Sequence, residues 1–382
     1  MTRAGMERLA QELEHLKRTF RHRSLELRRG VDFTSNDYLG LSRHPALREA
    51  IVESLDVAAG VGAAGSRLLR GHQAGHAELE RFAAQFFASE KALYFSTGFL
   101  ANYALFTGLP GRHDTIVFDA LVHASVKEGI HASHARHIKA RHNDINAFED
   151  ACKRARARGS KQLWLAVESV YSMDGDVAPI DDLLALARIY EAVLIIDEAH
   201  ATGILGPNGR GLAEGRHDAP IITLHTCGKG LGVAGALICG HTTIVDYLVN
   251  TSRPFIYSTA PPEIVAIAVK RALQLIDEEP WRRSRLKELS QIARQTFRGI
   301  SGANVPLTAT TQILPVVIGS EERALEVAAR CQAAGFDVRA IRPPTVPAGT
   351  SRLRVAISVD RTTDEISGLG QALSNALHQE AA

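Results

Sequence analysis

Strand and helix patterns alternate from about residue 76 to residue 224, and this alternation limits the possible folds more than any other feature. Helical patterns at 145–158 and 180–190 separate short apolar runs that are typical of strands buried on both faces. These runs lie at 93–96, 115–119, 163–168, 193–197 and 221–224. Strands that alternate with helices form a parallel sheet covered by helices. The sequence therefore predicts an α/β fold with one large, mostly parallel sheet.

The N-terminal segment predicts a helical arm. Residues 6–23 form an amphipathic pattern in which Leu9, Leu13, Leu16 and Phe20 recur at helical spacing. One short helix cannot bury its own apolar stripe. We therefore expect this helix to lie against the main body of the protein or against a partner subunit.

The C-terminal part predicts a second, smaller domain. After a long helical passage at 262–299, broken near Pro280, the pattern changes to strand, helix, strand, strand and helix. These five segments are 313–318, 322–334, 337–341, 352–358 and 363–378. We therefore expect an arm at 1–40, a large domain at 41–270 and a small α/β domain at 271–382.

Composition excludes several classes of function. The 382 residues carry 44 basic and 42 acidic side chains, so the net charge of +2 does not favour a nucleic-acid or membrane partner. The four cysteines lack CxxC spacing, which argues against a metal site or a disulfide framework. No apolar run reaches about 18 residues and no signal peptide opens the sequence, so we expect a cytoplasmic protein.

One lysine occupies an unusual position. A strand-like run at 220–224 leads into Lys229, and glycines follow it at 230, 232 and 235. Glycines leave room for a flat group to approach the backbone, and a desolvated amine loses its proton more easily. Such a lysine suits a Schiff base with a carbonyl cofactor. Taken alone, a glycine-rich turn with an incidental lysine fits the same residues.

A second stretch favours the cofactor interpretation. The apolar run at 193–196 ends at Asp197, and His200 follows three residues later. Ligands bind at the carboxyl ends of strands in open parallel sheets. An aspartate there can pair with a protonated pyridine nitrogen, and His200 can face the same crevice. A strand followed by Asp-x-x-His, and a later strand followed by Thr-x-x-Lys, is the layout of a pyridoxal phosphate (PLP) enzyme.

With these motifs the chain resembles the α-oxoamine synthases over residues 9 to 375, most closely the branch that makes 8-amino-7-oxononanoate in biotin biosynthesis. The resemblance implies PLP-dependent fold type I, which is aspartate aminotransferase-like, and a homodimer with shared active sites. It also implies a decarboxylative condensation of L-alanine with pimeloyl-CoA or pimeloyl-carrier protein, an acyltransferase reaction. The string at 341–354, with its prolines and arginines, is similar to that branch in particular.

The resemblance also implies the site residues. Lys229, His123 and Asp197 are the implied catalytic residues, with Lys229 as Schiff-base lysine and general base. The implied cofactor-binding residues are Gly98, Phe99, His123, Ser172, Asp197, His200, Thr226, Lys229, Ser258 and Thr259, of which Ser258 and Thr259 reach the phosphate from the neighbouring subunit.

Four further residues are implied to bind substrate. Arg354 matches the arginine that holds the amino-acid carboxylate, and Asn36 and Thr345 match substrate contacts. Arg21 matches the arginine for the distal carboxylate of the pimeloyl chain, with Arg23 as an alternative. The segment 60–71, which contains Arg70, has fewer glycines and serines than the family often has, so the preferred acyl chain stays open.

Three other functions share some of these motifs. A sister oxoamine synthase with another amino acid or acyl thioester fits the same motifs, and so does an aminotransferase on the same fold. The string Asp197-Glu198-Ala199-His200 also spells a helicase motif. A helicase, however, needs a GxxxxGK[ST] phosphate loop. Gly228-Lys229-Gly230 lacks the hydroxyl residue that this loop requires.

Overall fold

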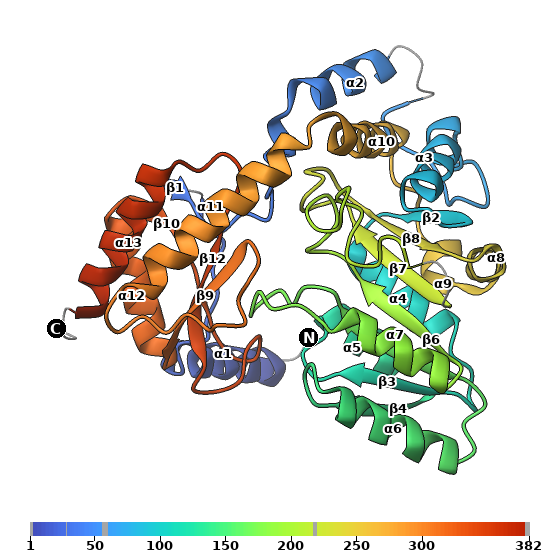
Figure 1. The fold of residues 1–382 in the computed structure, drawn as a ribbon, viewed down its shortest axis with the longest axis horizontal. Coiled ribbons are helices and arrows are strands. Elements are labelled where there is room, and N and C mark those ends of the chain that lie inside the picture. The colour runs from blue at the N-terminus through green and yellow to red at the C-terminus, as the bar shows by residue number, and fades with distance from the viewer. Residues whose placement is uncertain (1–2, 28, 56–59, 217–219, 379–382) are drawn as a thin grey trace. The chain divides into compact units, whose positions relative to one another are not determined.

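The structure, a computed structural model, describes residues 3–27, 29–55, 60–216 and 220–378 (Figure 1). The described residues divide into two units. The larger unit comprises Asp37–Ser172 and Val177–Ser284, and the smaller unit comprises Met1–Asn36, Met173–Asp176 and Arg285–Ala382. Each unit has its own sheet, and each is described by itself.

Seven strands form the sheet of the larger unit, in the order β2-β8-β7-β6-β5-β3-β4. They are β2 (Lys91–Phe95), β3 (Thr115–Asp119), β4 (Arg136–Ala140), β5 (Leu163–Glu168), β6 (Ala192–Asp197), β7 (Ile221–Thr226) and β8 (Ala236–Gly240). Pairing is parallel from β7 through β4, and β8 runs antiparallel to both of its neighbours. The predicted large, mostly parallel sheet is confirmed.

The larger unit also contains α-helices, several of which cover the two faces of the sheet. They are α2 (Pro45–Leu55), α3 (Ala74–Phe86), α4 (Gly98–Gly108), α5 (Ala124–Ala132), α6 (Ile145–Ala157), α7 (Ile180–Ile189), α8 (Thr242–Thr251), α9 (Arg253–Ile256) and α10 (Glu263–Glu278). A short 3₁₀ turn, Leu41–Arg43, precedes α2. Helix α11 (Trp281–Arg298) begins after a break at Glu279 and Pro280, as the sequence predicted.

Strand alternation explains why both faces are buried. Ile195 packs into one apolar cluster with residues of α4 and α5, and its neighbours Leu194 and Ile196 pack into another with residues of α6 and α7. Successive side chains of a strand point to opposite faces, so a strand between two helical layers must be apolar at every position. This pattern is why the central strands were visible in the sequence.

The smaller unit contains a three-stranded antiparallel sheet in the order β11-β12-β9 and a two-stranded parallel pair of β1 and β10. The strands are β1 (Val31–Asp32), β9 (Ile313–Gly319), β10 (Phe336–Asp337), β11 (Ala340–Ile341) and β12 (Ser351–Ala356). Its helices are α1 (Arg3–Arg18), α12 (Glu321–Ala333), α13 (Thr363–His378) and the part of α11 from Arg285 onward.

Two predicted elements of the smaller unit were wrong in detail. The predicted strand at 337–341 is two short strands, β10 and β11, which belong to different sheets. The predicted helix at 6–23 ends at Arg18 because Phe20 adopts a left-handed conformation (φ 56°). The backbone N–H groups of Arg21 and His22 then both donate to Leu16 O, which closes the helix end.

The apolar stripe of α1 is exposed in the part of the smaller unit that the structure describes. Leu9, Leu13 and Leu16 are all exposed, at 41%, 50% and 37%. The expectation that this helix lies against the main body or against a partner subunit stays a prediction.

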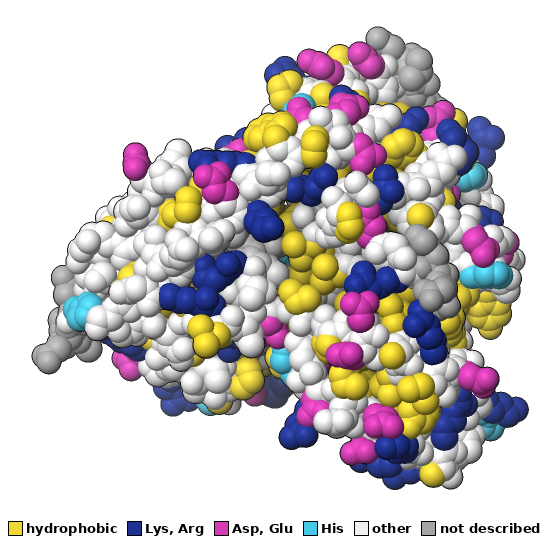
Figure 2. All heavy atoms as spheres, in the orientation of Figure 1, with side chains coloured by type: hydrophobic (Ala, Val, Ile, Leu, Met, Phe, Trp, Pro, Cys, Tyr) yellow, Lys and Arg dark blue, Asp and Glu magenta, His cyan; other side chains and the backbone are white. Residues whose placement is uncertain are grey.

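The surface carries both signs of charge. Figure 2 shows lysines and arginines interspersed with aspartates and glutamates over the face that it draws. Among the described residues, no helix combines the length and the apolar character needed to cross a membrane.

Candidate active site

Three polar residues end neighbouring strands of the larger unit. Glu168, Asp197 and Thr226 are the last residues of β5, β6 and β7, which run parallel and side by side. Glu168 lies directly opposite Asp197 in the register. This is the carboxyl edge of the sheet, where parallel α/β folds bind ligands.

Asp197 is buried and held by neutral donors. Its Oδ2 accepts from Asn102 Nδ2 at 2.7 Å, and its Oδ1 accepts from the backbone N–H of Ala199 at 3.0 Å. The residue is 5% exposed. These two bonds fix the plane of the carboxyl group and bring no cation with them, which leaves the group suited to a cationic partner such as a protonated ring nitrogen.

His200 lies in the turn after β6, where a tyrosine fixes its ring. His200 Nδ1 is 2.8 Å from the hydroxyl of Tyr38, and both residues are buried. A tyrosine that donates to Nδ1 leaves the proton on Nε2, so Nε2 can donate to a ligand oxygen. Tyr38 was not singled out in the sequence, because nothing in its local pattern indicates a partner 162 residues away.

Lys229 is half-buried in a tight loop between β7 and β8. The loop closes through a hydrogen bond of 2.9 Å from Gly232 N to Lys229 O. A Cβ atom on Gly230 would lie 2.4 Å from the carbonyl oxygen of Thr202, so glycine is required there. The positive charge of Lys229 acts on both His123 and Glu168: it adds to the lowering of the pKa of His123 and opposes the rise in the pKa of Glu168.

The first turn of α4 forms a cradle for an anion. Thr97 caps this helix by accepting from Leu100 N at 3.1 Å, and the amides of Gly98 and Phe99 belong to the turn that lacks intrahelical acceptors. A Cβ atom on Gly98 would lie 2.6 Å from Thr226 Cγ2. Gly98 and Thr226 are thus in contact, and together they can hold a phosphate group.

His123 is the N-cap residue of α5. Its Nδ1 lies 2.8 Å from Ser125 Oγ, and Asn102 Nδ2 lies 3.0 Å from the same oxygen. The ring is exposed on one side, but the protein atoms packed around it desolvate it and lower its pKa, against the opposing effect of Asp197. His123 therefore connects through hydrogen bonds to the Asp197 group.

Glu168 is a buried acid that the sequence did not single out. It is 3% exposed, and burial together with the nearby Asp197 raises its pKa to about 8. Backbone N–H groups of His123 and Ser172 bond to its carboxyl group, while Oε1 has no partner in the described part of the structure. Glu168 is therefore protonated at neutral pH in the folded protein.

This burial predicts a pH-dependent stability. Between a pH near the model glutamate value of 4.5 and about 8, the unfolded chain loses the Glu168 proton while the folded chain keeps it, so the free energy of unfolding falls as pH rises. Glu168→Gln removes this titration. In thermal melts of the PLP-free protein, we expect the variant to gain stability relative to the native chain between pH 5 and pH 8.

The exposed glutamate on α5, changed as Glu128→Gln, is the matched control for loss of a charge without burial. A Glu168→Gln melting temperature that stays at a constant offset from the native value across this range would contradict a buried, protonated Glu168.

The remaining predicted cofactor residues are Ser172, Ser258 and Thr259. Ser172 lies in the turn after β5, where its backbone bonds to Glu168. Ser258 and Thr259 line a small cavity of about 20 Å³ together with Arg67, Ser96 and Phe255. That Ser258 and Thr259 serve the site of a partner subunit stays a prediction.

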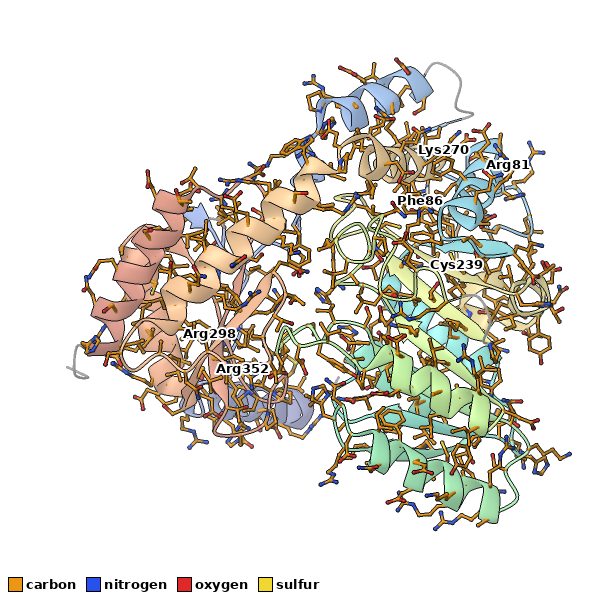
Figure 3. All side chains as sticks on the ribbon, in the orientation of Figure 1. Arg81, Phe86, Cys239, Lys270, Arg298 and Arg352 are labelled. Carbon is orange, nitrogen blue, oxygen red and sulfur yellow. The ribbon has the colours of Figure 1, made fainter. Side chains whose placement is uncertain are left out.

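The predicted carboxylate-binding arginine lies on β12 of the smaller unit. Arg354 is 7% exposed, and its Nη2 donates to Asn36 Oδ1 at 3.0 Å. Arg352, labelled in Figure 3, is also buried and forms an ion pair with Asp174. Neither arginine belongs to a solvated face. The structure therefore brings together Arg354 and Asn36, two of the predicted substrate residues.

The two candidates for the distal carboxylate have different surroundings. Arg21 Nη2 forms an ion pair with Glu321 Oε1 at 2.9 Å, at the first turn of α12. Arg23 Nη2 donates to the hydroxyl of Thr345 at 3.3 Å, and Thr345 is itself a predicted substrate residue. Arg23 also lines a cavity of about 610 Å³ with Phe20, Arg339 and other residues of this unit.

The geometry agrees with comparisons to known proteins. The family model described as aminotransferase class I and II matches residues 28–371. An 8-amino-7-oxononanoate synthase from Methylococcus capsulatus is 42% identical over 92% of this chain and 90% of its own, and the enzyme of that name from Burkholderia mallei gives the same three values.

Two solved structures are similar over most of the chain. A serine palmitoyltransferase variant from S. paucimobilis, with a bound PLP–myriocin aldimine, is 25% identical with a TM-score of 0.89, covering 98% of this chain and 97% of its own. An 8-amino-7-oxononanoate synthase from Francisella tularensis is 27% identical with a TM-score of 0.78, covering 91% and 97%.

Proposed function

Since this chain belongs to the class I and II aminotransferase family and, within it, to the α-oxoamine synthases, we propose that it is an 8-amino-7-oxononanoate synthase. The enzyme uses PLP and condenses L-alanine with a pimeloyl thioester, with loss of CO₂, in biotin biosynthesis. The observation that carries this proposal is the 42% identity to enzymes of that name over 92% of the chain.

The residues of the larger unit fit PLP. The first turn of α4 and Thr226 suit its phosphate, Asp197 suits its ring nitrogen, and Lys229 suits its aldehyde. His200 donates from Nε2 to its phenolic oxygen. When bound, PLP draws electrons away from the α-carbon of an amino acid attached to it.

Each of these residues performs one physical task. Lys229 holds the cofactor and, once displaced by the amino acid, accepts the α-proton on Nζ. Asp197 keeps a positive charge on the ring nitrogen, because a carboxylate stabilises a nearby cation. His123 donates a hydrogen bond to the oxygen of the thioester as negative charge develops there. Ser172, in the turn after β5, supports the residues that hold the cofactor.

Substrate recognition falls to residues of the smaller unit. Arg354, with Asn36 beside its guanidinium, binds the carboxylate of L-alanine, because a planar guanidinium matches a carboxylate in shape and charge. Thr345 contacts the substrate. Either Arg21 or Arg23 binds the distal carboxylate, and Arg21 must first give up its ion pair with Glu321. Among the contacts described above, Arg23 donates only to the hydroxyl of Thr345. Its side chain therefore needs less rearrangement than that of Arg21 to bind a carboxylate.

Replacing Arg354 should weaken alanine binding. For Arg354→Lys, which keeps the charge but loses the planar pair of donors, we expect the KM for L-alanine to rise by about tenfold or more. The KM for the pimeloyl thioester should stay within about twofold. Steady-state kinetics with each substrate varied in turn provide the measurement. An equal rise in both KM values would show that Arg354 has a structural role instead.

The function itself is tested by a direct assay. Purified, PLP-loaded protein is incubated with L-alanine and pimeloyl-CoA, and free thiol and product mass are followed. Thiol release that requires L-alanine, with the mass of 8-amino-7-oxononanoate, is the expected result. Release with glycine or L-serine, or with another acyl thioester only, would move the function to a sister synthase.

Two parallel reactions resolve the remaining alternatives. Pimeloyl-carrier protein in place of pimeloyl-CoA identifies the acyl donor. Incubation with a keto acid and no thioester detects an aminotransferase, which would exchange the amino group without releasing thiol.

The enzyme is further proposed to be a cytoplasmic homodimer. A partner subunit would cover the exposed Leu9, Leu13 and Leu16 of α1 and would receive Ser258 and Thr259 at its phosphate site. Sedimentation equilibrium measures the mass in solution, and a monomer at micromolar concentration would contradict shared active sites.

A further inference from the structure

A chain of hydrogen bonds connects His123 to Asp197 through two residues that have no assigned role. Asn102 Nδ2 lies 2.7 Å from Asp197 Oδ2 and 3.0 Å from Ser125 Oγ. Ser125 Oγ lies 2.8 Å from His123 Nδ1, and the backbone N–H of Ser125 donates to the same nitrogen at 3.2 Å. Asn102 is 2% exposed and Ser125 is 1% exposed, so water does not compete for these bonds.

The direction of each bond follows from what each group can donate. An ionised carboxylate only accepts hydrogen bonds, so the amide of Asn102 must turn its NH₂ group toward Asp197. The second proton of that NH₂ group then points to Ser125 Oγ. Because Ser125 Oγ accepts this bond, its own proton is available for His123 Nδ1. Nδ1 therefore faces two donors, the hydroxyl and the backbone N–H of Ser125.

A nitrogen that faces two donors cannot carry a proton itself. Neutral His123 must then hold its single proton on Nε2. We propose that Asn102 and Ser125 are positioning residues that fix His123 as the Nε2–H tautomer and orient Asp197 through the same amide. This inference rests on the proposed function only for its kinetic consequence, because the tautomer is a property of the protein itself.

The charges around His123 are consistent with a neutral ring. Lys229 and Lys127 disfavour the imidazolium and Asp197 favours it, while burial disfavours it most, so the pKa of His123 is lowered. Protonation of Nδ1 would also oppose the backbone N–H of Ser125, which cannot rotate away. The hydrogen-bonded chain through Asn102 and Ser125, which we call the relay, thus keeps a hydrogen-bond donor at Nε2 of His123 throughout the working pH range.

The tautomer can be observed directly. In protein labelled with ¹⁵N-histidine, two-bond ¹⁵N–¹H spectra distinguish a protonated ring nitrogen from an unprotonated one, and a His123→Gln sample identifies the signals of His123. In PLP-loaded and PLP-free protein at pH 7.5, we expect an unprotonated Nδ1 and a protonated Nε2. A protonated Nδ1 on neutral His123 would overturn the proposal.

Variants test whether the relay is responsible. Ser125→Ala removes the hydroxyl donor at 2.8 Å and leaves only the longer backbone bond of 3.2 Å at Nδ1, so we expect the Nε2–H tautomer to be partly lost and kcat to fall by about tenfold, with the KM for L-alanine within about twofold. Ser125→Thr keeps the hydroxyl and should restore the Nε2–H pattern. Ser133→Ala, which removes a hydroxyl that accepts from Ala135 N at the other end of α5, is the matched control.

A change at Asn102 should affect both ends of the relay. Asn102→Asp places a second carboxyl group at hydrogen-bond distance from Asp197, where both cannot ionise. We expect weaker PLP binding in absorbance titrations, together with a changed His123 tautomer. If Ser125→Ala and Asn102→Asp both fold and leave the nitrogen pattern unchanged, the relay does not set the tautomer.

The outcomes separate this proposal from the proposed function. Absence of condensation activity with an intact Nε2–H pattern would refute the function and leave the relay standing. Normal condensation activity with a protonated Nδ1 on His123 would refute the relay and leave the proposed function standing.

Discussion

Lys229→Ala is expected to abolish condensation, with a fall in turnover greater than about 10⁴-fold. Loss of a general base alone typically lowers a rate by about 10²–10⁴-fold, and this variant also loses the covalent attachment of the cofactor. Assays of thiol release measure turnover. The absorbance of the lysine-bound cofactor should disappear in the same sample, because no other amine takes its place.

The fold should survive this change. Lys229 lies in a loop whose backbone bonds, such as Gly232 N to Lys229 O, do not involve the side chain. The exposed lysine of the same unit, changed as Lys161→Ala, is the control and should keep both turnover and the cofactor absorbance. Turnover of the Lys229→Ala protein within about 10²-fold of the native value would refute its assignment as the cofactor lysine.

Four of the central strands could be predicted from the sequence because burial on both faces leaves a continuous apolar run, whereas β8, which is equally buried, was not predicted. Strands β3, β5, β6 and β7 have this property, and all four were predicted. Strand β4, with the sequence Arg-His-Ile-Lys-Ala, lies at the edge of the sheet with most of its side chains exposed. Its composition is that of an exposed segment, so hydropathy could not reveal it.

The motif residues of the site were also predictable, since they lie at strand ends and in glycine-rich turns. Asp197 ends β6, and Lys229 follows β7 by three residues. The residues that orient them were not predictable. Asn102 lies 95 residues from Asp197 in sequence, and Tyr38 lies 162 residues from His200. A buried asparagine on a helix has many ordinary explanations, and only the folded chain shows which partner it has.

Glu168 was missed for a different reason. It ends the predicted strand at 163–168, but a glutamate at the end of a strand is usually ionised and exposed. Its pKa is raised first by burial and then by the charge of Asp197, which the pairing of β5 with β6 places directly opposite. The pKa of a buried acid therefore depends on strand pairing, which the local sequence does not specify.

Asp197→Asn should lower turnover by about 10²–10³-fold, less than the change at Lys229. The amide has the shape of the carboxyl group but only one acceptor oxygen, so it can keep the bond from Ala199 N while the amide of Asn102 rotates to present its oxygen to the new NH₂ group, and the fold should be preserved. It carries no charge, however, and cannot stabilise a proton on the ring nitrogen of the cofactor. The positive charge that withdraws electrons from the substrate is then lost.

The neighbouring acid provides the comparison for this variant. Glu168→Gln also removes a carboxyl group at the same edge of the sheet, but Glu168 is already protonated in the folded protein, so its turnover near pH 7 should fall far less. Turnover and PLP affinity are measured for both variants at pH 7. Since only Asp197 provides a negative charge in this interpretation, equal losses in the two variants would show that packing at the strand ends, and not the charge of Asp197, determines the rate.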